Sequence, residues 1–335
     1  MSGTMRRVWQ GIGALSAIAA LAIAVGASPR GGLVDPPEPP LPADPDAWVA
    51  ERIAASQADG VKPEALERLV RKVDGTSEVA FLFVHGFGAG PGEGAYVVDQ
   101  LAADWGANTY YTRLPGHGLD KDRHASTTPD AWLARAADAL AVTAALGERV
   151  VVVGASTGSA LATWLAATYP ERVDALVLTS PFYDYPDPWM APVLNSRVGV
   201  HLAQAVLGDR DCRMVSERRQ PAYGDHWLEW QRHQALASLE QIRRHCSRPE
   251  LHARVTQPTL MMYHYAGPEP GQHDEVVSIE AMREAYGRFN GGRPHAKSRL
   301  VTVADGNHVL LSEHVRTDKR SVRMALDVFL NNVLQ

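Results

Sequence analysis

Short apolar runs alternate along this chain with segments of helical periodicity, and this alternation restricts the fold more than any other feature. The runs are EVAFLFVHG (78–86), NTYYTRLPGHG (108–118), RVVVVGAS (149–156), VDALVLTSP (173–181), PTLMMYHY (258–265) and SRLVTVADGNH (298–308). The helical segments are Pro129–Leu146, Gly158–Tyr169, Ser278–Phe289 and Val315–Leu334. Continuous apolar runs are typical of strands buried on both faces, so the pattern predicts an α/β fold whose mostly parallel central sheet is covered by helices on both faces. In such a sheet the functional groups lie just beyond the carboxyl ends of the strands.

The interval between Pro181 and Gln257 interrupts this alternation. It is too long for a loop in a compact domain, and it contains tryptophans and many helix-forming residues. We therefore expect a helical cap over the strand ends at residues 183–255, with the α/β core formed by residues 78–182 and 256–335. Both cysteines, Cys212 and Cys246, fall in the cap, where they either form a disulfide or remain as buried free thiols.

The N-terminal residues differ in composition from the rest of the chain. Arg6 and Arg7 precede a stretch without charged residues from Val8 to Ser28, which predicts either a cleaved export signal or a membrane anchor at residues 1–28. The predicted protein is thus exported to the periplasm or the extracellular face, and the anchor alternative would attach it to the membrane. A proline-rich linker at residues 29–46 is expected to be an extended spacer that does not pack. Helical patterns at Asp46–Gln57 and Pro63–Val73 predict a helical extension over residues 47–77.

Ser156 lies within Gly154-Ala155-Ser156-Thr157-Gly158, between an apolar run and a helical segment. A Gly-x-Ser-x-Gly sequence in this context predicts a sharp turn in which side chains at the glycine positions would clash. Such a turn presents the serine hydroxyl at the strand end. It also places the Thr157 N–H at a helix N-terminus, where it can donate to a negatively charged oxygen. The sequence therefore predicts a nucleophile at Ser156 and an oxyanion donor at Thr157.

A serine nucleophile needs a base, and the base needs an acid to orient it. His308 follows the last apolar run in VADGNHVLLSE, and Asp274 follows the run PTLMMYHY. The chain order of serine, acid and histidine, with each at a strand end, favours Asp274 as the acid and His308 as the base. Glu269 and Glu275 are the alternatives to Asp274.

The run FVHGFGAG ends the first core strand, and the N–H of its Phe87 is the expected second oxyanion donor. Its glycines do not form a dinucleotide motif, because the residue at the third glycine position is Pro91. The chain has no Gly-Lys-Ser/Thr, CxxC or HExxH pattern, so the sequence predicts neither a cofactor nor a metal. The net charge of -5 argues against nucleic acid as a partner. His117, in LPGHG, is expected to order its loop by hydrogen bonding.

Together these motifs resemble the α/β-hydrolase superfamily, in particular its serine esterases and lipases similar to monoacylglycerol lipases and bacterial carboxylesterases. The matching segments run from about Val79 to the C-terminus and are His85-Gly86-Phe87-Gly88, Leu114-Pro115-Gly116-His117-Gly118, Gly154-Ala155-Ser156-Thr157-Gly158, Asp274-Glu275-Val276-Val277 and Gly306-Asn307-His308. The resemblance implies the α/β-hydrolase fold and an acyl pocket under the cap. It also implies the catalytic residues Ser156, Asp274 and His308, with the N–H groups of Phe87 and Thr157 as the oxyanion hole. The loop before Asp274 is longer than the family pattern.

The hypothesis that follows is a cofactor-free serine hydrolase acting on a small-molecule carboxylic ester, either acylglycerol-like or with a short or medium acyl group. The acyl group would be held on Ser156. An acyltransferase that passes this acyl group to an alcohol or amine is an alternative that the sequence leaves open, and so is a small peptidase. A catalytically silent, membrane-tethered binding protein is an alternative of a different class.

Overall fold

The structure is a computed structural model that describes residues 31–199, 201, 212–213 and 223–335. Its centre is a seven-stranded sheet in the order β1-β3-β2-β4-β5-β8-β9. All neighbouring strands are parallel except β1 and β3, which pair antiparallel. The strands are β1 (Arg68–Val70), β2 (Ser77–Val84), β3 (Asn108–Thr112), β4 (Gly147–Ala155), β5 (Ala175–Thr179), β8 (Thr259–His264) and β9 (Arg299–Val303). The predicted mostly parallel sheet is thus confirmed.

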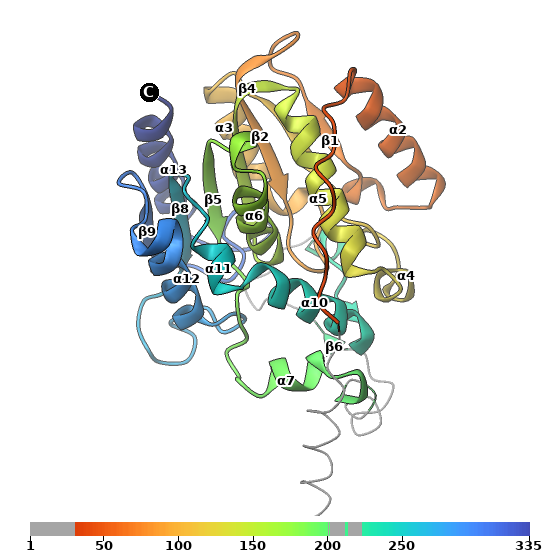
Figure 1. Ribbon diagram of the computed structural model, residues 1–335, viewed down its shortest axis with the longest axis vertical. Helices are drawn as coiled ribbons and strands as arrows, with labels where there is room; N and C mark the ends of the chain where they lie inside the picture. The colour runs from red at the N-terminus through yellow and green to blue at the C-terminus, as the bar shows by residue number, and fades with distance from the viewer. Residues whose placement is uncertain (1–30, 200, 202–211, 214–222) are drawn as a thin grey trace, which may run out of the picture.

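Helices cover both faces of the sheet (Figure 1). They include α2 (Pro45–Ala58), α3 (Gly92–Asp104), α4 (Lys121–Ala125), α5 (Pro129–Ala144), α6 (Thr157–Thr168), α12 (Ile279–Gly292) and α13 (Lys319–Leu334), with short 3-10 turns at Pro63–Ala65 and Pro170–Arg172. Alternate residues of each strand face opposite layers. Leu82 and Val152 pack in the cluster with α5, α6 and α12, whereas Phe83 and Val153 pack in the cluster with α3 and α13. This two-sided burial explains why the strand runs are apolar throughout.

Several helices begin at capping side chains. Ser278, the first residue of the helical segment predicted at Ser278–Phe289, accepts a hydrogen bond from Ala281 N at 3.2 Å and caps α12. Thr128 and Asp318 cap α5 and α13 in the same way. Each cap satisfies an N–H group that has no partner inside its helix.

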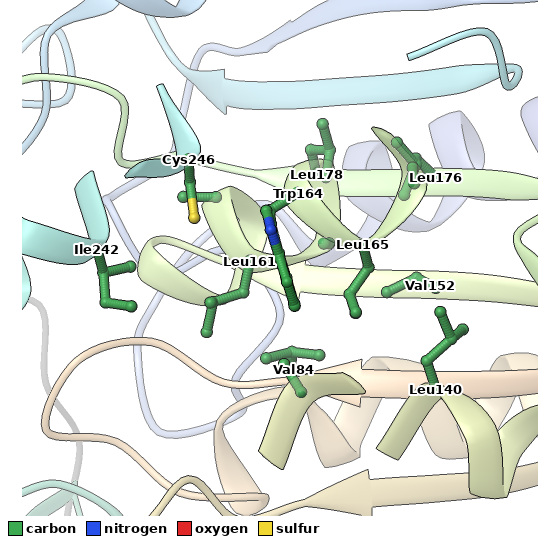
Figure 2. Packing of buried hydrophobic residues seen from close by; sticks show 14 of the residues in the cluster. Val84, Leu140, Val152, Leu161, Trp164, Leu165, Leu176, Leu178, Ile242 and Cys246 are labelled. Carbon is green, nitrogen blue, oxygen red and sulfur yellow. The ribbon is translucent and has the colours of Figure 1, made fainter. Parts of the chain in front are cut away.

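The described part of the interval between β5 and β8 contains the helices α7 (Met190–Asn195), α9 (Tyr223–His226), α10 (His233–Cys246) and α11 (Pro249–His252). It also contains the antiparallel pair β6 (Cys212–Arg213) and β7 (Trp230–Gln231), which the sequence did not predict. Helix α10 packs against α6: Figure 2 shows Ile242 and Cys246 on the side of α6 that carries Leu161 and Trp164. Cys246 is buried and free. Of the two alternatives for the cysteines, a disulfide or buried free thiols, the structure therefore has the free thiol at Cys246.

The proline-rich segment packs on the domain, so the prediction of an unpacked spacer is wrong. Asp35 Oδ1 accepts a hydrogen bond from Trp164 Nε1 at 2.7 Å and lies 2.6 Å from His245 Nε2. Further donors to this segment are Tyr169 Oη to the Pro36 carbonyl at 3.0 Å and Arg172 to the Pro39 carbonyl at 2.8 Å. In Figure 1 the segment is the red trace that runs alongside α5. An extended proline-rich chain has no internal hydrogen bonds, and here donors from the domain satisfy its carbonyls.

The two N-terminal helical patterns have different outcomes. The pattern at Asp46–Gln57 is confirmed as α2, but the helix predicted at Pro63–Val73 is wrong. Its residues form a 3-10 turn and then β1, which pairs Leu69 with Tyr110. The free edge of β3 supplies backbone partners to this short apolar run, and such pairing overrides a weak helical periodicity.

The predicted leader at residues 1–28 lies outside the described residues. Within the described ranges, no helix combines the length and the apolar character needed to cross a bilayer.

Candidate active site

Ser156 occupies the turn between β4 and α6 with a backbone conformation of φ 52° and ψ -115°. A positive φ at a residue other than glycine costs on the order of 1–3 kcal/mol and persists only where the surroundings enforce it. Here a Cβ on Gly158 would lie 2.0 Å from the Val84 carbonyl oxygen, and a Cβ on Gly154 would lie 2.6 Å from the Gly158 carbonyl oxygen. Both flanking glycines are therefore required by the close approach of the backbone, as the sequence predicts.

Asp274 and His308 meet at the carboxyl edge of the sheet, after β8 and β9. His308 Nδ1 lies 2.8 Å from Asp274 Oδ2, and the other carboxylate oxygen accepts the Val276 N–H at 3.0 Å. The alternative acids are exposed: Glu275 accepts the Gly271 N–H at 2.9 Å, and Glu269 lies in the same exposed loop. Of the three acids considered, Asp274 is thus the one that the fold joins to His308.

The pKa values of this pair move apart as an ion pair requires. Burial alone would lower the pKa of His308, but the charge of Asp274 and its hydrogen bond, with a contribution from Glu93, hold that pKa above its ordinary value. Burial alone would raise the pKa of Asp274, but His308 and the Val276 N–H leave it below its ordinary value. The interaction therefore favours the ionised form of Asp274 and the protonated form of His308.

Phe87 and Thr157 flank Ser156 from two different strand ends. Thr157 is the first residue of α6, so its N–H is among those that have no partner inside the helix. Phe87 follows the turn after β2. Both residues line the cavity that Ser156 lines. The arrangement suits donation to an oxygen bound beside Ser156.

A cavity of about 600 Å³ opens above these residues. Ser156, Asp274, His308, Phe87 and Thr157 all line it, so the structure brings the five predicted site residues together. Its apolar wall includes Phe182, Tyr185, Met190, Leu236, Leu239 and Val309. Several of these belong to the segment predicted as a cap.

Buried histidines support the turn that carries Phe87. His85 Nε2 accepts the Leu114 N–H at 3.0 Å, while its Nδ1 lies 2.8 Å from the Gly86 carbonyl. His117 lies next to His124, with their Nε2 atoms 3.2 Å apart, so His117 orders its loop as expected. Burial lowers the pKa of both His85 and His124 to about 4. These rings are therefore neutral near pH 7.

The sequence did not single out Glu93, which also lines the cavity. It lies in GPGEGAY, where a glutamate between glycines resembles an ordinary surface turn. No spacing pattern marks it, because its burial depends on α3 docking beneath the β2 turn. Among the described residues there is no group of three or more His, Cys, Asp or Glu side chains suited to hold a metal ion.

Comparisons with known proteins agree with this architecture. A family model described as alpha/beta hydrolase fold matches residues 79–207. The dihydrolipoyllysine-residue acetyltransferase component of the acetoin cleaving system of Cupriavidus necator is 36% identical over 146 residues, which are 42% of this chain and 35% of that protein. The pimeloyl-acyl-carrier-protein methyl ester esterase of Neisseria meningitidis is 33% identical over 122 residues, which are 35% of this chain and 44% of that protein. The chain thus spans less than half the length of either relative.

A solved structure gives the wider match in three dimensions. A metagenome-derived lipolytic enzyme superposes with a TM-score of 0.64 at 20% identity, and the match covers 81% of this chain and 99% of that one. The sheet order, the strained serine turn and these similarities lead to one conclusion: the chain has the α/β-hydrolase fold and resembles the esterase and lipase branch of the α/β-hydrolase superfamily.

Proposed function

We propose that this protein is a serine hydrolase that cleaves carboxylic esters through an acyl-enzyme on Ser156. The observation that carries the proposal is the 2.8 Å contact between His308 Nδ1 and Asp274 Oδ2, at the wall of the cavity that Ser156 also lines. A histidine whose Nδ1–H is held by a buried carboxylate has its Nε2 free to accept a proton.

In the proposed reaction, His308 Nε2 takes the proton of the Ser156 hydroxyl while Oγ attacks the acyl carbon. The N–H groups of Phe87 and Thr157 stabilise the resulting oxyanion, and one such donor contributes ~3 kcal/mol. His308 then gives its proton to the departing alcohol, and the acyl group remains bound to Ser156 as an acyl-enzyme. A water molecule loses a proton to His308 and attacks the acyl carbon, and the proton returns to Ser156 as the acid product leaves.

The substrate class follows from the cavity. Its volume of about 600 Å³ lies in the range of roughly 300–1,000 Å³ that is usual for small-molecule sites. The apolar wall formed with the Phe182 and Leu239 side chains favours a hydrocarbon acyl group over a charged metabolite. We therefore propose acylglycerol-like esters or esters of short and medium acyl groups as substrates.

A fluorophosphonate probe tests the nucleophile directly. Peptide mapping of the labelled protein is expected to find the probe on Ser156, and Ser156→Ala is expected to remain unlabelled with the same unfolding curve. A chain-length series of p-nitrophenyl esters then ranks the acyl groups by kcat/KM. A folded wild-type protein that takes up no probe at Ser156 would refute the proposal.

Acyl transfer is the second candidate, because one relative is named an acetyltransferase component. The same acyl-enzyme would pass its acyl group to an alcohol instead of water. Product analysis in the presence of a competing alcohol separates the two: hydrolysis gives mainly the free acid, whereas transfer gives mainly the new ester.

Export of the protein remains our proposal from the uncharged stretch at Val8–Ser28. Either the leader is cleaved or it anchors the domain to the membrane. Cell fractionation with N-terminal sequencing of the mature protein distinguishes these outcomes, and recovery of the full-length chain in the cytosol would contradict both.

A further inference from the structure

Glu93 is a buried carboxyl next to the proposed nucleophile that the serine mechanism does not use. It lies in the first turn of α3, and its exposed fraction is 3%. Its Oε2 accepts the Gly86 N–H at 2.6 Å. A Cβ built on Gly86 would lie 3.2 Å from Ser156 Cβ and 3.3 Å from each Glu93 oxygen. The Glu93 carboxyl and the Ser156 side chain therefore both border the space that a side chain on Gly86 would occupy.

Three parts of the site converge on this carboxyl. Gly86 belongs to the turn that presents the Phe87 N–H, Trp227 hydrogen-bonds to Glu93 from the segment inserted between β5 and β8, and the charge of His308 interacts with it. The α3 N-terminus, which carries a partial positive charge, also favours a carboxylate in its first turn. The neighbouring titratable groups are His226, whose ring lies against Gly92, and His314, stacked on His226 with ring centroids 4.3 Å apart.

Burial raises the pKa of Glu93 to about 7, although Gly86, His308 and Trp227 each act to lower it. Glu93 in turn helps to raise the pKa of His308. The two groups are therefore coupled, and an ionised Glu93 favours the protonated form of His308. That form appears twice in the proposed reaction, once in acylation and once in deacylation.

We propose that Glu93 is a positioning residue of this active site: its carboxylate holds the Gly86 turn that presents the Phe87 N–H, and its charge stabilises protonated His308. This inference rests on the proposed serine hydrolase function. It adds to that mechanism a second carboxylate, whose charge acts on His308 independently of Asp274.

Two substitutions separate the two roles. In Glu93→Gln the amide oxygen still accepts from Gly86 but the charge is lost. The expected result is a roughly tenfold lower kcat and an acid limb of kcat/KM that moves to lower pH, because His308 loses a charge that raises its pKa.

In Glu93→Asp the charge remains but the shorter side chain withdraws from Gly86. The expected result is a similar fall in kcat, with KM and the position of the acid limb little changed.

Glu51→Gln, an exposed substitution on α2, removes the same charge far from the site and serves as the matched control for general charge effects. Fluorophosphonate labelling of Ser156 in the wild type establishes the serine chemistry separately, so the proposed function stands whether or not the Glu93 variants differ from the wild type. Wild-type kcat and an unmoved acid limb in the Gln variant would overturn the role of Glu93. If neither variant folds, the pH profile of kcat/KM of the wild-type protein tests the inference. Because protonation of either Glu93 or His308 lowers activity, we expect its acid limb to be steeper than a single ionisation produces. An acid limb that fits a single ionisation overturns the inference.

Discussion

Asp35 Oδ1 lies 2.6 Å from His245 Nε2, so the proline-rich segment is joined to α10, a helix 210 positions further along the chain. The same oxygen accepts the Trp164 indole N–H at 2.7 Å. Trp164 and His245 are both buried, so each needs this acceptor. The contact ties the start of the described chain to the segment that forms part of the cavity wall.

Asp35→Ala removes the acceptor of both donors. Leaving buried donors unpaired costs on the order of 1–3 kcal/mol, and the partial exposure of Asp35 makes the lower part of that range the expected loss. Urea denaturation of the wild type and the variant measures the change in the free energy of unfolding. Glu38→Gln is the matched control, because Glu38 forms an exposed ion pair with Arg172 and such pairs contribute about 0–1 kcal/mol. Equal losses in the two variants would contradict the role assigned to Asp35.

Gly158→Ala tests the serine turn. Its Cβ would lie 2.0 Å from the Val84 carbonyl oxygen and 2.6 Å from the His85 carbonyl oxygen, so the backbone must move. We expect at least a roughly hundredfold fall in kcat/KM, because a displacement of about 1 Å at a reacting group has that effect, together with a lower melting temperature. The control is Gly287→Ala in α12, where a Cβ meets no atom within 4 Å. That change should stabilise the protein by about 0.5–1 kcal/mol through helix propensity. A Gly158→Ala enzyme of normal activity would show that the turn tolerates a side chain.

The pH dependence of hydrolysis follows from His308. Only neutral His308 accepts the Ser156 proton, and its pKa is raised above the ordinary value of 6.5. Activity should therefore fall as the pH drops, and the midpoint should lie above that of an unperturbed histidine. Asp274→Asn removes the charge that raises this pKa. We expect kcat lower by roughly four orders of magnitude and a midpoint of the kcat/KM profile at lower pH. An unchanged midpoint would argue against the Asp274–His308 pair.

The buried histidines predict acid sensitivity of the fold. Burial lowers the pKa of His85 and His124 to about 4 in the folded state, whereas the unfolded values lie near 6.5. Their contribution is fully present above about pH 6.5, and it decreases as the pH falls toward 4 because the unfolded chain binds the protons. Each group contributes a slope of up to about 1.4 kcal/mol per pH unit in this window. Urea titrations between these pH values measure the slope. His124→Gln should make it shallower, and an identical slope would contradict this explanation.

The strands and helices of the core could be predicted from the sequence, because they depend on local features such as apolar runs and capping residues. The runs around Phe83 and Val153 are apolar on both sides because α3 and α13 cover one face and α5 and α6 the other. Ser278 caps α12 through its own neighbours. The region around β1 could not be read in this way, because its three residues become a strand by pairing with β3. A periodicity that short fits either a helix or a strand.

The sequence by itself determined the serine turn. Gly154, Ser156 and Gly158 lie within five consecutive residues, and their pattern predicts the turn. The contact that requires glycine at position 154 is with Gly158 and Ser159 and is local, whereas Gly158 is held against the Val84 carbonyl of β2. Asp274 and His308 were inferred from chain order and strand ends, but only the folded sheet brings them to 2.8 Å and distinguishes Asp274 from Glu275. Glu93 and the docking of Asp35 were decided by tertiary structure alone. The environment of each carboxylate depends on partners distant in the chain or packed from another element, and no periodicity in the sequence predicts such contacts.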